Sequence, residues 1–291
     1  MTATTETTRP TASALADAHL TAGGILRSEW VKLLTLRSTW WCLGVIVALT
    51  AGIPLLISLA IGDAQALPGD AGADFGYYNW MNATVLPVGF SVLAAAVLGC
   101  LVITGEYGTG MIRSTMTAAP GRLGALLAKA LVIGAVIFVA SFVALVIGAA
   151  LSGAVLGAKG YTIDPGDGRV WVTLLSAAGY PALVAVFSVG VGAIIRNSAG
   201  AIASVLGLLL VVPTILQLVG ALLKADWAFD VGAFLPSSLG TTMYTPVIDL
   251  GGMSFSQGSV ELAPWSAALA MLAWAVAALA GGAALVKRRD V

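Results

Sequence analysis

The sequence predicts an all-α integral membrane protein that crosses the bilayer six times. Of its 291 residues, 59% are hydrophobic and only 10% are charged, whereas soluble domains carry about 25% charged residues. The mean hydropathy is correspondingly high, at +0.97. Six uncharged apolar stretches reach the roughly 20 residues that a helix needs to cross the hydrocarbon core. They are residues 40–62, 83–104, 130–156, 170–195, 199–223 and 264–286.

The chain begins with a polar segment, residues 1–22, that is rich in Thr and Ala. It lacks the hydrophobic run of a secretory signal peptide, and its composition predicts a disordered cytoplasmic tail. Residues 23–38 follow, with Leu26, Trp30 and Leu33 at helical spacing and with basic side chains that can reach lipid headgroups. This pattern predicts an amphipathic helix on the inner membrane surface. The alternative, an N-terminal extension of the first span, is disfavoured by the charges.

Lysine and arginine set the orientation of the transmembrane region, residues 39–291. If the N-terminus is inside, the inner segments hold 11 of the 14 Lys and Arg residues, and the outer loops hold only Lys159, Arg169 and Lys224. Cytoplasmic segments of membrane proteins are enriched in these residues. We therefore expect the N-terminus and the C-terminus to be cytoplasmic, which agrees with an even number of spans.

Two connecting segments are long. Residues 105–129 form the inner loop between the second and third spans, with a short helix candidate at residues 111–119. An ordinary loop and a coupling helix that sits in a groove of a cytoplasmic protein fit this segment equally well. Residues 224–263 form an acidic outer loop with aromatic residues. A solvated cap over the spans is the favoured interpretation of this loop, ahead of a substrate site.

Proline interrupts four of the six spans. In a membrane helix, neighbouring helices can satisfy the carbonyl that a proline frees, so a tolerated kink is the simpler interpretation. A hinge or a helix break beside a transport pathway is the functional alternative. The candidate hinges are Pro54, Pro87, Pro181 and Pro213.

The sequence lacks the residues that several classes of function require. The six stretches contain no Asp, Glu, Lys, Arg or His, and a charge at mid-membrane costs roughly 2.5–3.5 kcal/mol on insertion scales, so no proton relay is expected there. The only histidine is His19, and Cys42 and Cys100 lie in separate apolar stretches, so no metal site is expected. No phosphate-binding loop or hydrolase motif occurs. We expect no enzyme activity, no bound cofactor and no nucleic-acid partner.

Three segments, in this order, resemble bacterial type-2 ATP-binding-cassette (ABC) exporter permeases, and the six-span layout matches as well. Ser28-Glu29-Trp30-Val31-Lys32-Leu33, followed by Leu36-Arg37-Ser38-Thr39-Trp40, is similar to their N-terminal elbow helix. Glu106-Tyr107-Gly108-Thr109-Gly110-Met111-Ile112-Arg113 is similar to their loop after the second span. Phe234-Leu235-Pro236-Ser237-Ser238-Leu239-Gly240 is similar to a segment of their last outer loop.

The resemblance implies the membrane subunit of an exporter in a bacterial plasma membrane. A separate cytoplasmic ATPase subunit would bind ATP and magnesium, and two permease subunits, as a homodimer or heterodimer in membrane lipid, would enclose the pathway. The residues expected to couple the chain to that ATPase are Glu29, Lys32, Glu106, Tyr107, Thr109 and Arg113. A Glu106–Arg113 pair would span two helical turns, beyond the usual four-residue spacing. The alternative is an ATP-independent channel or carrier.

Overall fold

The computed structural model describes residues 21–64, 70–110, 122–246 and 260–288. These residues form an all-α protein with six helices long and apolar enough to cross a membrane, which confirms the predicted fold class. The spans are α3 (Arg37–Ala60), α4 (Asp70–Val85) with α5 (Val88–Gly108), α7 (Arg122–Ala158), α8 (Gly168–Ile195), α9 (Ser198–Leu206) with η1 (Gly207–Val211) and α10 (Val212–Leu223), and α13 (Pro264–Arg288). Shorter helices are α2 (Ala22–Thr35), α11 (Asp226–Ala233) and α12 (Pro236–Tyr244).

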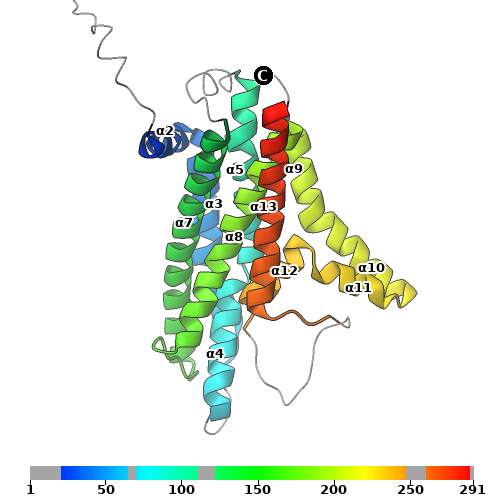
Figure 1. Cartoon of the computed structure of the whole chain (residues 1–291). Coiled ribbons are helices and arrows are strands. Elements are labelled where there is room, and N and C mark those ends of the chain that lie inside the picture. Colours follow the sequence, from blue (N-terminus) through cyan, green and yellow to red (C-terminus); the bar gives the residue numbers. More distant parts are fainter. Residues whose placement is uncertain (1–20, 65–69, 111–121, 247–259, 289–291) are drawn as a thin grey trace, which may run out of the picture.

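Successive spans run in opposite directions, so α2 and the C-terminal end of α13 lie at the same end of the bundle (Figure 1). We call this the inner end, because the distribution of Lys and Arg predicts that it faces the cytoplasm. The opposite end, where α7 meets α8, is called the outer end.

Helix α8 is the centre of the bundle and packs against α5, α7 and α13. Two glycines allow these helices to approach closely. A Cβ at Gly99 would lie 2.4 Å from the Ala185 carbonyl oxygen, and one at Gly190 would lie 2.5 Å from the backbone of Ala278. Small residues at contact points serve this purpose in membrane helices, where packing rather than water exclusion drives association.

The range predicted as one helix, residues 23–38, contains the end of one helix and the start of the next. Helix α2 ends at Thr35, Leu36 has an extended backbone, and α3 begins at Arg37. Thr21 caps α2, because its hydroxyl accepts a hydrogen bond from the backbone N–H of Gly24. Helix α2 thus begins at Ala22, inside the segment 1–22 that was predicted as a tail. Residues 1–20 lie outside the described part of the chain, so the disordered tail stays a prediction. The sharp turn at Leu36 separates α2 from the first span, as the amphipathic interpretation requires.

The four candidate hinge prolines occupy different settings. Pro87 is the N-cap of α5 and divides the second span into α4 and α5. Pro54 and Pro181 lie inside α3 and α8 and are buried, and Pro213 follows the π-helix η1 at the start of α10. Whether any of them bends during function stays a prediction.

Part of the segment at residues 224–263 enters the bundle, which corrects the prediction of a solvated cap there. Helix α12 packs against α8 and α13, and Leu239 is fully buried. The indole N–H of Trp274, ten residues into the 25-residue α13, donates to the Phe234 carbonyl at 3.0 Å. This contact is about 15 Å along α13 from its start. The segment therefore folds back beside α13, and residues 247–259 lie outside the described residues.

Candidate functional site

Three helices bring charged side chains together at the inner end. Helix α2 packs along α7 and presents Glu29 and Lys32, which are three residues apart and so share a helix face. Helix α5 contributes Glu106 from its last turn, and α7 contributes Lys129. Leu33, only 2% exposed, anchors α2 in the apolar packing beside these charges. We call Glu29, Lys32, Glu106 and Lys129 the inner charge cluster.

Each acid of the inner charge cluster contacts each base. Lys129 Nζ donates to Glu29 Oε2 at 2.5 Å and to Glu106 Oε1 at 2.8 Å. Lys32 Nζ donates to Glu29 Oε1 at 2.7 Å and to Glu106 Oε1 at 3.2 Å. The contacts form a closed ring of two carboxylates and two ammonium groups with no net charge. The ring joins α2, which is outside the spans, to the inner ends of α5 and α7.

Burial makes this cluster different from a surface ion pair. The side chains of Glu29, Glu106 and Lys129 are 3%, 6% and 4% exposed, whereas that of Lys32 is 28% exposed. Burial lowers the pKa of Lys32, but the hydrogen bond from Lys32 to Glu29 and the charge of Glu106 outweigh it and raise that pKa overall. Removing one of the three buried members would leave a buried charge without compensation, which costs about 3–5 kcal/mol in other proteins.

The inner charge cluster is not arranged as a metal site. A metal would need free carboxylate or imidazole ligands, whereas both carboxylates are engaged by ammonium groups. The described residues contain no group of three His, Cys, Asp or Glu side chains that could hold a metal ion. One oxygen remains available: the buried Oε2 of Glu106 has no hydrogen-bond partner among the described residues.

A second polar contact lies beside the cluster, where α8 turns into α9. The guanidinium carbon of Arg196 lies 5.1 Å from the ring centre of Tyr107 and one of its nitrogens reaches the Leu285 carbonyl at 3.4 Å. Arg196 has a left-handed backbone, with φ of 60°, which lets α8 end and α9 begin two residues later. The Ser198 hydroxyl donates to Thr104 on α5 at 2.8 Å. The inner ends of α5, α8 and α13 are thereby connected.

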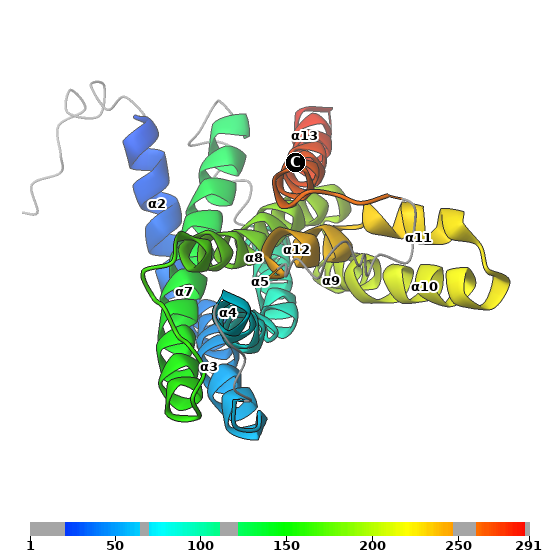
Figure 2. The same cartoon turned by 90° about the horizontal axis from the view of Figure 1, so that it is seen from below.

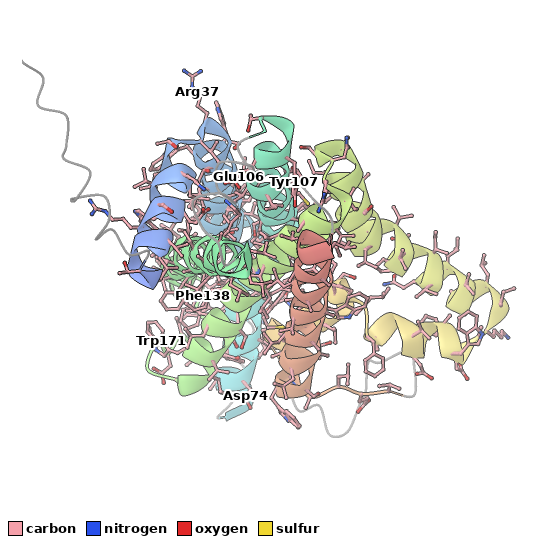
Figure 3. All side chains as sticks on the ribbon, turned by 45° about the horizontal axis from the view of Figure 1, so that its top comes forward. Arg37, Asp74, Glu106, Tyr107, Phe138 and Trp171 are labelled. Carbon is pink, nitrogen blue, oxygen red and sulfur yellow. The ribbon has the colours of Figure 1, made fainter. Side chains whose placement is uncertain are left out.

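The six predicted coupling residues separate into four groups. Glu29, Lys32 and Glu106 come together in the inner charge cluster. Tyr107 follows on α5 but contacts Arg196 instead; Figure 3 shows Glu106 and Tyr107 side by side at the inner end and Asp74 at the other end. Thr109 is exposed, and its hydroxyl donates to the Gly105 carbonyl at 2.9 Å. The remaining residue, Arg113, lies outside the described residues, as does the short helix predicted at residues 111–119.

Lys129 is the member of the cluster that the sequence analysis missed. It was expected to end the inner loop 105–129, but α5 continues to Gly108 and α7 already begins at Arg122. Lys129 is thus seven residues, about two turns, inside α7. A signal was present: apolar residues flank Lys129 on both sides, and a lysine in such a helix needs a partner of opposite charge.

No protein-family model matches the chain, and no curated protein matches it in sequence. The function of this multi-pass membrane protein is therefore argued from its residues and their geometry.

Proposed function

We propose that the chain is the permease subunit of an ABC-type exporter, moved by a separate cytoplasmic ATPase that docks at the inner end. Two such subunits in the bacterial plasma membrane, alike or different, would enclose the pathway. ATP and magnesium would bind to the ATPase, because this chain has no phosphate-binding loop.

The observation that carries the proposal is the inner charge cluster. A helix outside the spans, α2, is tied through buried ion pairs to the inner ends of α5 and α7. A push on α2 or on the segment after α5 would therefore reach two spans through a stiff contact. Exposed ion pairs would transmit less, because water and salt screen them.

The residues next to the cluster suit a protein partner. Arg27, Ser28, Trp30 and Val31 are exposed on α2, so the helix presents both charge and apolar area on the side away from the bundle. Short helices with such anchors dock in grooves of partner proteins. We also expect membrane lipid to cover part of the exposed side of α2, since Trp30 suits an interfacial position.

The proposal is tested by affinity purification of the chain from its native membrane, followed by identification of the proteins that co-purify. An ABC-type ATPase should co-purify at a fixed ratio, and the complex should hydrolyse ATP while the isolated chain does not. Purification of a stable chain that transports with no ATPase bound would contradict the proposal.

Coupling is tested on residues of the cluster. Glu29→Gln and Glu106→Gln should leave insertion of the chain into the membrane intact but lower transport by the complex several-fold, because either change breaks the ring. The matched control is Arg169→Gln, which alters an exposed ion pair at the outer end and should leave transport unchanged. Equal transport by the cluster variants and the control would remove the cluster from the mechanism.

The second candidate function is an ATP-independent carrier. The observation that favours it is the presence of buried carboxylates in Glu29 and Glu106, which are groups that a proton-coupled carrier uses. Against it, both are engaged by lysines in a neutral ring. Purified chain in liposomes separates the two candidates: flux driven by a pH gradient without ATP supports the carrier.

A further inference from the structure

The fifth span is the least enclosed part of the bundle. Only 17% of its most apolar window is buried, compared with 61% for the second and fourth spans. Its inner half, α9, packs against α5 and α8, whereas α10 packs mainly against α11. Figures 1 and 2 show α10 and α11 projecting together from the bundle. One side of α10 therefore has no partner helix in the described chain.

This uncovered span also carries the exposed polar side chains. In the described spans, the Ser, Thr, Asn and Gln residues that are exposed are Ser204, Thr214 and Gln217, and all three lie in the fifth span. The Thr214 hydroxyl is satisfied, because it donates to the Leu210 carbonyl at 2.6 Å. The Gln217 amide makes no hydrogen bond with the described residues.

Contact with lipid would be unfavourable for an amide in this position. Gln217 lies six residues before Leu223, the last residue of α10, which is about 9 Å along the helix. The neighbouring Leu218 and Leu222 are 57% and 72% exposed, so the surface around the amide is apolar. Lipid chains cannot hydrogen-bond, and an unsatisfied amide in an apolar medium costs several kcal/mol.

Two of these polar residues, Thr214 and Gln217, lie on one face of α10 that can accept another helix. Thr214, Gln217 and Ala221 are three and four residues apart, so they share a face of α10, and all three are exposed. The adjoining side of the helix is already occupied, because Gly220, three residues after Gln217, lies against the ring of Phe229 in α11. The small side chain of Ala221 leaves room for a close helix contact beside the amide.

We propose that this face of α10 packs against the same face of a second copy of the chain, with the Gln217 amide exchanging hydrogen bonds with Gln217 of that copy. An amide carries both a donor and an acceptor, so it is complementary to itself across a two-fold axis. The proposal deepens the proposed function, which requires a second permease subunit, by assigning the surface and the residue through which an identical subunit binds.

The test is disulfide trapping in membranes that contain the chain without any ATPase. In a background of Cys42→Ala and Cys100→Ala, Gln217→Cys should form a covalent dimer when a mild oxidant is added. The matched control is Leu269→Cys on α13, at a position that is 58% exposed and outside the proposed face; it should stay monomeric. Because no ATPase is present, failure of this test is distinct from failure of the coupling proposal.

A second measurement follows dimer formation by the chain with its native cysteines in liposomes. The readout is energy transfer between copies that carry donor and acceptor labels. Gln217→Leu should weaken the dimer by about threefold or more, since interhelical hydrogen bonds in membranes contribute modestly, and Leu222→Ala should not. Two results would overturn the proposal. One is no covalent dimer from Gln217→Cys; the other is rapid modification of that cysteine by a water-soluble thiol reagent, which would make the face the wall of an aqueous pathway.

Discussion

Ion pairs occur at both ends of the bundle, but the two ends enclose them differently. At the inner end, the contacts of Lys129 with Glu29 and Glu106 join side chains that are 3–6% exposed. At the outer end, Arg169 contacts Asp74 at 2.8 Å between side chains that are 52% and 49% exposed. The distances are similar, so distance does not rank these pairs. Burial does, because water offers the exposed groups nearly equal stabilisation when they separate.

The largest effect should come from Lys129→Met at the inner end. This change leaves two buried carboxylates with only Lys32 nearby, and we expect it to lower the free energy of unfolding by about 3–5 kcal/mol. Thermal unfolding in detergent can be followed with a fluorogenic thiol reagent that reads the exposure of the free cysteines Cys42 and Cys100.

A neutral version of the cluster is the control for that prediction. The quadruple variant Glu29→Gln, Lys32→Met, Glu106→Gln and Lys129→Met should be more stable than Lys129→Met alone, because no uncompensated charge remains. If Lys129→Met unfolds at the same temperature as Arg169→Met, burial does not set the value of these ion pairs.

The next effect concerns Lys159, which closes the outer end of α3. Its ammonium group donates to the carbonyls of Ser58 at 3.0 Å and Leu59 at 2.7 Å, and also to that of Ile61. Cations near a helix C-terminus satisfy its free carbonyls. We expect Lys159→Met to cost about 1–2 kcal/mol, measured by the same thermal assay, and Lys159→Arg to cost less because it keeps donors there.

A smaller effect is expected from Lys32, the partly exposed member of the inner charge cluster. Lys32→Met should cost about 1 kcal/mol, since solvent screens this corner of the ring. The pKa of Lys32 is raised above its ordinary value of 10.5, so the folded protein holds this proton more tightly than the unfolded chain. The stabilising contribution is therefore complete below pH 10.5 and is lost as the pH rises through the raised pKa.

The pH dependence has a direct measurement. The difference in unfolding temperature between the native chain and Lys32→Met should be constant from about pH 7 to pH 9 and should shrink above the ordinary lysine pKa. A difference that instead grows with rising pH would mean that Lys32 is destabilised in the folded state.

The elements that depend on local composition could be predicted from the sequence. The six spans follow from length and hydropathy, which depend on local composition, and the structure confirms them. The amphipathic helix before the first span was recognisable for the same reason, although its end was placed three residues late. Thr35 and Leu36 are compatible with a continued helix, and the extended backbone at Leu36 depends on how α2 meets α7.

Three of the four residues of the inner charge cluster were selected from the sequence, but their contact was not predicted. Glu29, Lys32 and Glu106 were selected because of a family resemblance. Nothing local places the first two within reach of Glu106, which follows Lys32 by 74 residues. Lys129 was assigned to a loop because a charge next to an apolar stretch usually ends a span. It lies inside α7 because Glu29 and Glu106 neutralise it there, and that pairing exists only after α2, α5 and α7 have packed.

The smallest effect should come from Arg169→Gln at the outer end. This side chain contacts Asp74, Asp167 and the ring of Tyr77, yet it is half exposed, so we expect a cost of about 0–1 kcal/mol. A double-mutant cycle with Asp74→Asn isolates the ion pair, and its coupling energy should fall further when the salt concentration is raised from 0.05 M to about 0.5 M. The cost of Lys129→Met should not change over this range, because ions do not reach the buried ring. A salt-sensitive inner cluster together with a salt-insensitive outer pair would reverse the ranking, and the mechanical role assigned to the inner end would lose its physical basis.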